Sequence, residues 1–108
     1  MSALVVLSTV GTAADAERIG RALVERGLAA CVNVLPAVTS IYRWKGKVEK
    51  DEERLLVIKT RAERFEALRQ ALVSLHPYEV PEVLALPIAD GHQPYLDWLD
   101  ESVKEDGG

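Results

Sequence analysis

The sequence predicts an α+β fold, in which a four-stranded sheet carries two helices on one face and a third helix follows at the C-terminus. Strand-like and helical patterns come in the order strand, helix, strand, strand, helix, strand, helix. The segment Ala29–Thr60 is typical of two long strands about a single turn. The order is the split βαβ arrangement, βαββαβ, of a ferredoxin-like sandwich, and right-handed crossovers place the first and third strands at its centre.

Composition limits the class of protein. The 108 residues fit a single domain spanning 1–108, and 48% hydrophobic residues are enough for a packed core. The formal net charge of -4 disfavours nucleic-acid binding, which usually needs a basic face. The single cysteine excludes an internal disulfide and fits a reducing cytosol. We see no secretory signal and no apolar stretch long enough to cross a membrane, so we expect a cytoplasmic protein.

The first strand and helix have clear boundaries. Ala3–Val10 is an apolar run rich in valine, typical of a strand buried on both faces. Thr12 followed by Asp15 resembles a capping box that starts a helix, and Gly27 ends this helix as a left-handed cap residue.

The two long strands of Ala29–Thr60 form a hairpin that extends beyond its own domain. Each arm has about 13 residues on either side of a turn at Lys45-Gly46, or roughly 43 Å, whereas a domain of this length is roughly 34 Å across. The outer half of the hairpin carries apolar side chains that a monomer cannot cover: Ile41, Tyr42, Trp44 and Val48. The sequence therefore predicts an assembly of several copies.

The turn also predicts the register of the hairpin. In the outer half Tyr42 faces Glu49 and Ile41 faces Lys50. In the inner half a regular ladder pairs Leu35 with Leu56, Val34 with Val57 and Cys31 with Thr60. Pro36 cannot donate to a ladder and indicates a bulge, which would shift the register beyond it by one residue.

The second half of the chain adds two helices and a strand. Thr60-Arg-Ala-Glu63 has the pattern of a capping box, and the helix that follows must stop at His76 because Pro77 disfavours a helical residue before it. Glu82–Ile88 is the predicted fourth strand. Pro94 suits the first turn of a last helix, which carries Leu96, Leu99 and Val103 on one side with Trp98 beside them, and Lys104–Gly108 is expected to fray.

Four segments together resemble the CutA family of divalent-cation tolerance proteins: Leu28–Asn33, Ser40–Gly46, Leu75–Glu82 and Tyr95–Trp98. The resemblance covers nearly the whole chain. It implies a ferredoxin-like subunit in a cytosolic homotrimer joined through the long hairpin strands, similar to PII-type signalling proteins. It also implies a link to tolerance of copper and other divalent metals, without an agreed catalytic reaction.

Two residues are candidates for metal binding. Cys31 suits either a buried small hydrophobe or a soft ligand for Cu(I), with Lys59 close by to favour the thiolate. His76 suits either a residue at a helix C-terminus or a metal ligand or proton-transfer group. The copper site implied by the resemblance needs a cysteine in the first strand and adjacent histidines, but Ser8 and Leu75 stand at these positions. Only His76 matches, so we expect no preformed tight copper site.

A second hypothesis places a ligand cleft beside the hairpin. Tyr42 and Trp44 share one face of its outer half, and they suit an interface or the wall of a cleft between subunits. Lys59, His76, Tyr78 and Glu82 could converge there to hold an anion or a small polar ligand. The charge run of residues 49–54 suits a solvated face, or a divalent-ion site built by threefold symmetry.

Motifs of common enzyme classes are missing from the sequence, including Gly-x-Ser-x-Gly, His-Glu-x-x-His, a P-loop and CxxC. We therefore favour a non-enzymatic homotrimer that binds a metal ion or small ligand at clefts between subunits. Two alternatives stay open: a small enzyme that uses His76 as acid or base with Lys59 holding an anionic group, and a structural or partner-binding scaffold.

Overall fold

The computed structural model describes residues 2–103, and it confirms the predicted α+β fold. Its elements are β1 (Ala3–Val10), α1 (Ala13–Glu25), β2 (Cys31–Trp44), β3 (Lys47–Arg61), the short 3-10 helix η1 (Ala62–Arg64), α2 (Phe65–Leu75), β4 (Leu84–Pro87) and α3 (Gln93–Ser102). The predicted fraying of Lys104–Gly108 lies outside the described residues.

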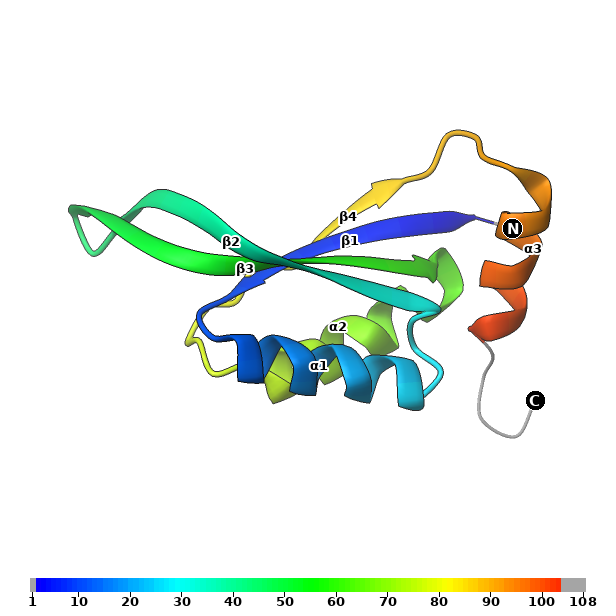
Figure 1. The fold of residues 1–108 in the computed structure, drawn as a ribbon, viewed down its shortest axis with the longest axis horizontal. Helices are drawn as coiled ribbons and strands as arrows, with labels where there is room; N and C mark the ends of the chain where they lie inside the picture. Colours follow the sequence, from blue (N-terminus) through cyan, green and yellow to red (C-terminus); the bar gives the residue numbers. More distant parts are fainter. Residues whose placement is uncertain (1, 104–108) are drawn as a thin grey trace.

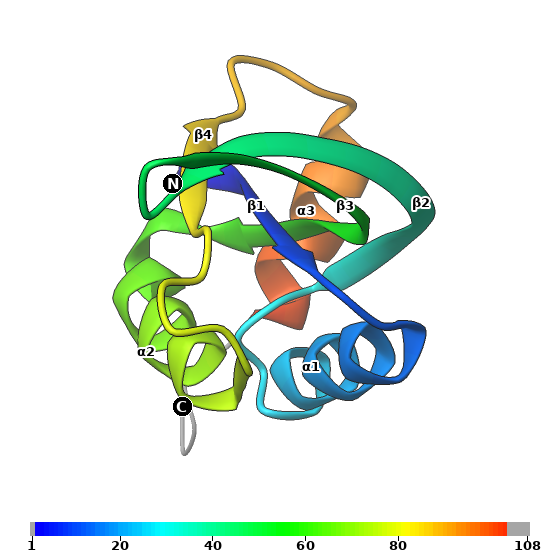
Figure 2. The same ribbon diagram turned by 90° about the vertical axis from the view of Figure 1, so that its left-hand side faces the viewer.

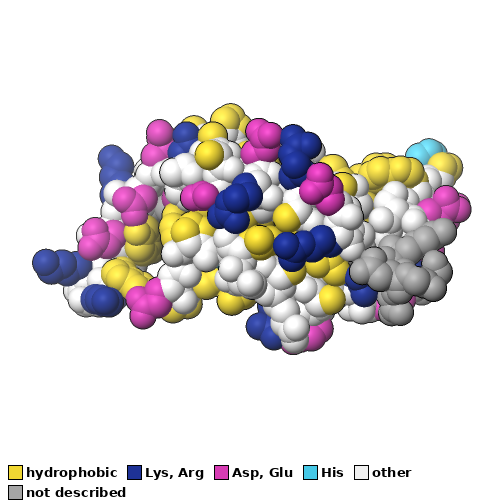
Figure 3. Space-filling model, turned by 90° about the horizontal axis from the view of Figure 1, so that it is seen from below, with side chains coloured by type: hydrophobic (Ala, Val, Ile, Leu, Met, Phe, Trp, Pro, Cys, Tyr) yellow, Lys and Arg dark blue, Asp and Glu magenta, His cyan; other side chains and the backbone are white. Residues whose placement is uncertain are grey.

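The sheet has the strand order β2-β3-β1-β4, and neighbouring strands are antiparallel. The first and third strands therefore lie at the centre, as the crossover rule predicts. Helices α1 and α2 cover one face of the sheet, while α3 lies at the end of the sheet opposite the hairpin tip (Figures 1 and 2). Seen from the helix side, the surface carries acidic and basic side chains mixed along its whole length, the hairpin end included (Figure 3).

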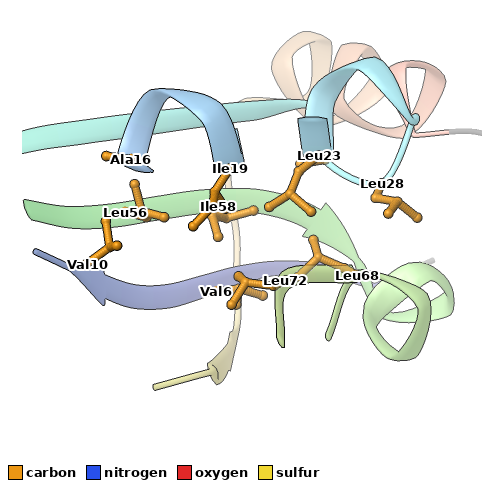
Figure 4. Close-up of a cluster of buried hydrophobic side chains, with 11 residues drawn as sticks. Val6, Val10, Ala16, Ile19, Leu23, Leu28, Leu56, Ile58, Leu68 and Leu72 are labelled. Carbon is orange, nitrogen blue, oxygen red and sulfur yellow. The ribbon is translucent and has the colours of Figure 1, made fainter. Parts of the chain in front are cut away.

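The hydrophobic core lies between the sheet and the two helices. Because side chains alternate along a strand, one face of β1 and of the inner half of β3 points toward the helices, and its fully buried side chains are Val6, Ser8, Val10, Leu56, Ile58 and Thr60. Figure 4 shows this core, which includes Val6, Val10, Ala16, Ile19, Leu23, Leu56, Ile58, Leu68 and Leu72. The other face of β1 is only partly covered, so the prediction of a strand buried on both faces is wrong for a single chain.

The hairpin of β2 and β3 reaches far beyond the helices, and the molecule measures 45 × 28 × 22 Å along its principal axes (Figure 1). Its turn residues Lys45 and Gly46 have φ values of 51° and 81°. Positive φ at both central positions is the conformation that matches the twist of a two-residue hairpin. Ile41 is 69% exposed and Val48 is 66% exposed, so the predicted uncovered apolar surface is present.

A bulge divides the hairpin into two registers. Tyr42 pairs with Glu49 and Ile41 with Lys50, as predicted. The pairing is interrupted between Leu35 and Val38, where Pro36 lies, and beyond this point it is shifted by one residue. The regular inner ladder is therefore wrong: the structure pairs Leu35 with Leu55, Val34 with Leu56 and Cys31 with Lys59.

For helices α1 and α2, three of the four predicted boundary signals are confirmed. Thr12 Oγ1 accepts a hydrogen bond from the Asp15 amide at 3.1 Å, and Gly27 has a φ of 70°. Helix α2 stops before His76, as Pro77 requires. The capping box at Thr60 is wrong, because β3 continues through Arg61 and the Thr60 hydroxyl donates to the Leu28 carbonyl at 2.7 Å instead.

The last strand is shorter than predicted. Strand β4 covers Leu84–Pro87 rather than Glu82–Ile88, although the Ile88 amide still donates to the Ala3 carbonyl at 3.0 Å. Pro94 lies in the first turn of α3, and Leu99 and Val103 of this region are buried. Arg61 of β3 and Asp100 of α3 form an ion pair at 2.6 Å, which fixes this helix on the end of the sheet.

Candidate ligand cleft

A cleft of about 680 Å³ lies beside the outer half of the hairpin. Both arms of the hairpin, the end of β1 and the loop between α2 and β4 contribute to it. Its lining residues are Thr9, Thr39, Ser40, Ile41, Tyr42, Trp44, Asp51, Glu53, Tyr78, Glu79, Val80 and Glu82.

The hairpin register explains why aromatic and acidic side chains meet in this cleft. Tyr42 and Trp44 are two residues apart on β2, and Asp51 and Glu53 are two residues apart on β3, so each pair projects to one face of its strand. Ser40 pairs with Asp51 across the ladder, which places the two sets on the same face. The bulge at Pro36 lies inward of this region, so it leaves the outer register unchanged.

One of the carboxylates that line the cleft is buried. Glu53 is only 6% exposed, and its Oε2 accepts a hydrogen bond from the Tyr78 hydroxyl at 2.5 Å. Burial and this bond to Glu53 raise the pKa of the Tyr78 hydroxyl. The phenol therefore stays protonated and acts as a donor to the carboxylate over the whole neutral range.

A second phenol and carboxylate pair lies farther along the hairpin. The Tyr42 hydroxyl donates to Asp51 Oδ2, and this hydrogen bond raises the pKa of Tyr42 to about 12. Tyr42 and Trp44 are each 39% exposed, so both rings present part of their surface to solvent. The Lys45 ammonium lies 5.7 Å from the centroid of the Trp44 ring, at the hairpin turn.

His76 contacts the backbone of two residues that line the cleft, Thr9 and Tyr78. It is 7% exposed, its Nε2 lies 2.8 Å from the Thr9 carbonyl oxygen, and its Nδ1 accepts from the Tyr78 amide at 3.1 Å. An acceptor role for Nδ1 assigns the proton to Nε2, which then donates to Thr9. Both ring nitrogens are thus engaged with backbone groups, and the His76 and Tyr78 rings pack with centroids 4.6 Å apart.

Cys31 and Lys59 lie in a different part of the sheet. The Cys31 thiol is partly buried and lies 3.7 Å from Asn33 Oδ1, which also accepts from the Lys59 ammonium. Lys59 pairs with Val5 on β1, four positions from Thr9 at the cleft, or about 13 Å along the strand. Lys59 therefore does not reach the cleft within its own chain, and its convergence there across a contact between subunits stays a prediction. Of the sequence-based candidates, Tyr42, Trp44, Tyr78 and Glu82 line it.

The electrostatic character of the cleft differs from the expectation of an anion site. Four carboxylates line it, from Asp51, Glu53, Glu79 and Glu82, and no Lys, Arg or His of residues 2–103 is part of its lining. The sequence did not single out Asp51 and Glu53 as residues of this cleft, because they stand in the charge run 49–54, which suits a solvated face or a divalent-ion site built by threefold symmetry. The signal that identifies them is alternation, which places Asp51 and Glu53 on the same face as Tyr42 across the hairpin.

Within residues 2–103, no three His, Cys, Asp or Glu side chains are grouped closely enough to hold a metal ion. Two carboxylates of the cleft each use one oxygen to accept from a tyrosine hydroxyl. In the same described range, none of the helices is both long enough and apolar enough to span a membrane.

The fold and the cleft define the class of this protein: a small split-βαβ sandwich with an overhanging hairpin that forms one wall of an acidic, aromatic cleft. Residues 4–102 match the family model described as CutA1 divalent ion tolerance protein. The chain belongs to this family.

The chain is 54% identical over 98 residues to the divalent-cation tolerance protein CutA of Thermus thermophilus, a match that covers 91% of this chain and 95% of the relative. The solved Thermus thermophilus structure has a TM-score of 0.92 at 52% identity, covering 94% of this chain and 99% of that chain. The crystal structure of CutA1 from Oryza sativa has a TM-score of 0.94 at 42% identity, covering 98% of this chain and 97% of that chain.

The relatives differ in length and compartment. The human protein CutA is 55% identical over 84 residues, which are 78% of this chain but only 47% of the human protein. The Arabidopsis thaliana relative is described as chloroplastic, and the structure of the Archaeoglobus fulgidus relative is described as periplasmic. The descriptions of the family model and of the Thermus thermophilus relative name ion tolerance and no chemical reaction.

Proposed function

We propose that this chain acts in divalent-cation tolerance as a homotrimer that binds a positively charged ligand, either a metal ion or a small organic cation, in the cleft beside the hairpin. The observation that carries the proposal is the lining of the cleft, to which the described part of the chain contributes four carboxylates, three aromatic side chains and no basic side chain. Such a lining attracts cations and repels anions. That the protein acts in the cytoplasm stays a prediction.

The homotrimer is supported by the hairpin. Ile41 and Val48 are among the most exposed large hydrophobic residues, on an arm that extends beyond the helices of its own chain. A neighbouring copy packed against this arm would remove apolar surface from water. Ile41 also lines the cleft, so the cleft would then lie between subunits.

The two side chains that the sequence suggested as metal ligands already have other partners. His76 has both ring nitrogens in hydrogen bonds to backbone groups, and Cys31 lies with Asn33 and Lys59 in another part of the sheet. A metal at His76 would have to displace one of these bonds. We therefore assign the cation to the carboxylates of the cleft, and we propose no catalytic role for His76.

Tryptophan fluorescence tests the proposal. Trp44 lines the cleft, while Trp98 lies on α3, so a Trp98→Phe variant leaves Trp44 as the only tryptophan. In this variant we expect saturable changes on titration with at least one of ZnCl₂, MgCl₂ or 1,4-diaminobutane dihydrochloride, compared with NaCl at the same ionic strength. The matched Trp44→Phe variant, which reports from Trp98, should not respond.

Adding Asp51→Asn and Glu53→Gln to the Trp98→Phe variant should remove the response, provided that this protein keeps its circular dichroism spectrum. A chain that gives the same signal with every cation as with NaCl would contradict the proposed cation site. Its role in tolerance would then rest on family membership alone.

A further inference from the structure

The connection between β4 and α3 contains an aspartate whose side chain turns back onto its own main chain. Asp90 and Gly91 lie outside helix and strand, and both are exposed. The connection forms an open arch beyond the end of β4 (Figures 1 and 2). The Gly91 amide donates to Asp90 Oδ1 at 2.8 Å, so the side-chain carboxyl group lies beside the next amide nitrogen of the chain.

This arrangement brings together the two groups that form a cyclic imide. The carboxyl carbon Cγ of Asp90 is one covalent bond from Oδ1, and a nucleophile held beside an electrophile reacts faster than one that must find it. Gly91 has no side chain to shield its nitrogen, and its backbone is free to adopt the geometry of a closing ring. Among the hydrogen bonds of residues 2–103, the Gly91 amide donates only to this carboxylate, so ring closure breaks no backbone ladder.

The other aspartates of the described range lie in helices or strands, where a regular backbone holds the following amide in a ladder or helical turn. A residue with a side chain follows each of them, whereas glycine follows Asp90. These aspartates are Asp15 in α1, Asp51 in β3, and Asp97 and Asp100 in α3. The structure therefore singles out Asp90 among residues 2–103.

We propose that Asp90-Gly91 is a site of spontaneous isoaspartate formation. The Gly91 nitrogen attacks Cγ of Asp90 in its carboxylic acid form, and a new C–N bond closes a five-membered succinimide ring. The hydroxyl group of the acid leaves with the amide proton as one water. A water then opens the ring: attack at Cγ restores aspartate, and attack at the main-chain carbonyl carbon breaks the former peptide bond and leaves the backbone running through Cγ. No electrons are transferred, and the net reaction is an isomerisation.

The product has a backbone that is one methylene longer before Gly91, with the carboxylate on Cα. This changes the shape of the connection, while the ion pair of Arg61 with Asp100 still fixes α3 on the sheet. The reaction needs only solvent water, so a sister chain packed on the hairpin does not prevent it. It is also independent of the proposed cation site, because neither Asp90 nor Gly91 lines the cleft.

Peptide mapping of the native chain, stored for several weeks at neutral pH and physiological temperature, tests this inference. Trypsin separates residues 70–104, which contain Asp90, from residues 105–108, which contain Asp106. Reversed-phase chromatography resolves the aspartyl and isoaspartyl forms of equal mass, and electron-transfer dissociation locates the changed residue. We expect an isoaspartyl form at Asp90 that increases with time, and severalfold less at Asp97 in α3.

Two variants at the site serve as controls, each checked by circular dichroism. Gly91→Ala should slow the accumulation severalfold, because a methyl group shields the nitrogen. Its Cβ would lie 3.3 Å from Leu96 Cδ2, at the end of a side chain that can move. Asp90→Glu should reduce the signal of residues 70–104 to background, because the longer side chain cannot form the five-membered ring.

The second Asp-Gly pair of the chain, Asp106-Gly107, provides a sequence-matched comparison. Isoaspartate at Asp106 with none at Asp90 would overturn the inference, since the connection would then block a ring that its sequence allows. Accumulation at Asp90 that is no faster than at Asp97, or that is equal in the native and Gly91→Ala chains, would also overturn it.

Discussion

Individual side chains in this protein show how local surroundings decide the role of a charge. Residues 49–54 are a run of charged side chains with one nearly buried member, Glu53, which accepts from Tyr78. The aromatic candidates Tyr42, Trp44 and Tyr78 could be predicted from the sequence. The acidic partners could not, because burial of Glu53 depends on Tyr78, which is 25 residues away in the chain.

Replacing Tyr78 with Phe should destabilise the fold by about 1–3 kcal/mol, because the buried Glu53 carboxylate loses its donor. Urea unfolding at a fixed protein concentration measures the effect. Tyr95→Phe is the matched control, since Tyr95 lies on α3, outside the cleft. Equal stability of the Tyr78→Phe variant and the native chain would show that Glu53 does not depend on this hydroxyl.

The Tyr42 and Asp51 pair predicts a loss of stability at high pH. In the folded chain the pKa of Tyr42 is raised from 10.0 to about 12 by its bond to Asp51. Because the folded state holds this proton more tightly, the contribution of the pair is fully present below pH 10 and is lost as the pH rises toward about 12.

Ultraviolet absorbance of tyrosinate should show a titration step near pH 12 that is missing in Tyr42→Phe. The variant should also lose less stability than the native chain between these two pH values. The assignment would be wrong if both proteins gave the same titration curve.

Secondary-structure elements were predictable where the signal is local. The turn at Lys45-Gly46, the cap at Thr12 and the stop before Pro77 depend on neighbouring residues, and the structure confirms them. The errors arise from tertiary contacts. Thr60 stands in the sequence pattern of a helix cap. Because β3 continues through Arg61, the Thr60 hydroxyl instead donates to the Leu28 carbonyl. The bulge at Pro36 and its one-residue shift were expected, and the paired strands confirm both.

Helix α1 provides a test of capping energetics. Thr12→Ala should lower the free energy of unfolding by about 1 kcal/mol, because the Asp15 amide loses its acceptor. Thr12→Ser retains a hydroxyl and should be close to the native chain. Chemical unfolding monitored by circular dichroism compares the three proteins, and equal stability of the Ala and Ser variants would argue against the cap.

The molecule as a whole has one well-covered face and one face that is only partly covered. Helices α1 and α2 bury the inner face of the sheet, while β2 and β4 are both edge strands. Leu84 and Leu86 of β4 are 55% and 50% exposed, and the hairpin arm adds Ile41 and Val48. An open edge with apolar side chains favours pairing with another chain. This distribution of surface is the physical basis for the proposed homotrimer.

If the hairpin arm forms the contact between chains, charged substitutions on it should weaken the homotrimer. Ile41→Lys combined with Val48→Lys should favour dissociation, because both changes place ammonium groups in the proposed contact between chains. Val73→Lys on α2, at a residue that is 41% exposed, is the matched control and should keep the native mass. Size-exclusion chromatography with light scattering distinguishes the variants, and a double variant that elutes with the native mass would place the contact elsewhere.

The most direct measurement is the mass of the native protein in solution. Sedimentation equilibrium at micromolar concentration should give three times the 11.9 kDa of one chain, because the apolar hairpin arm needs sister chains to cover it. A mass of 11.9 kDa under these conditions would contradict the homotrimer and, with it, the placement of the cleft between subunits.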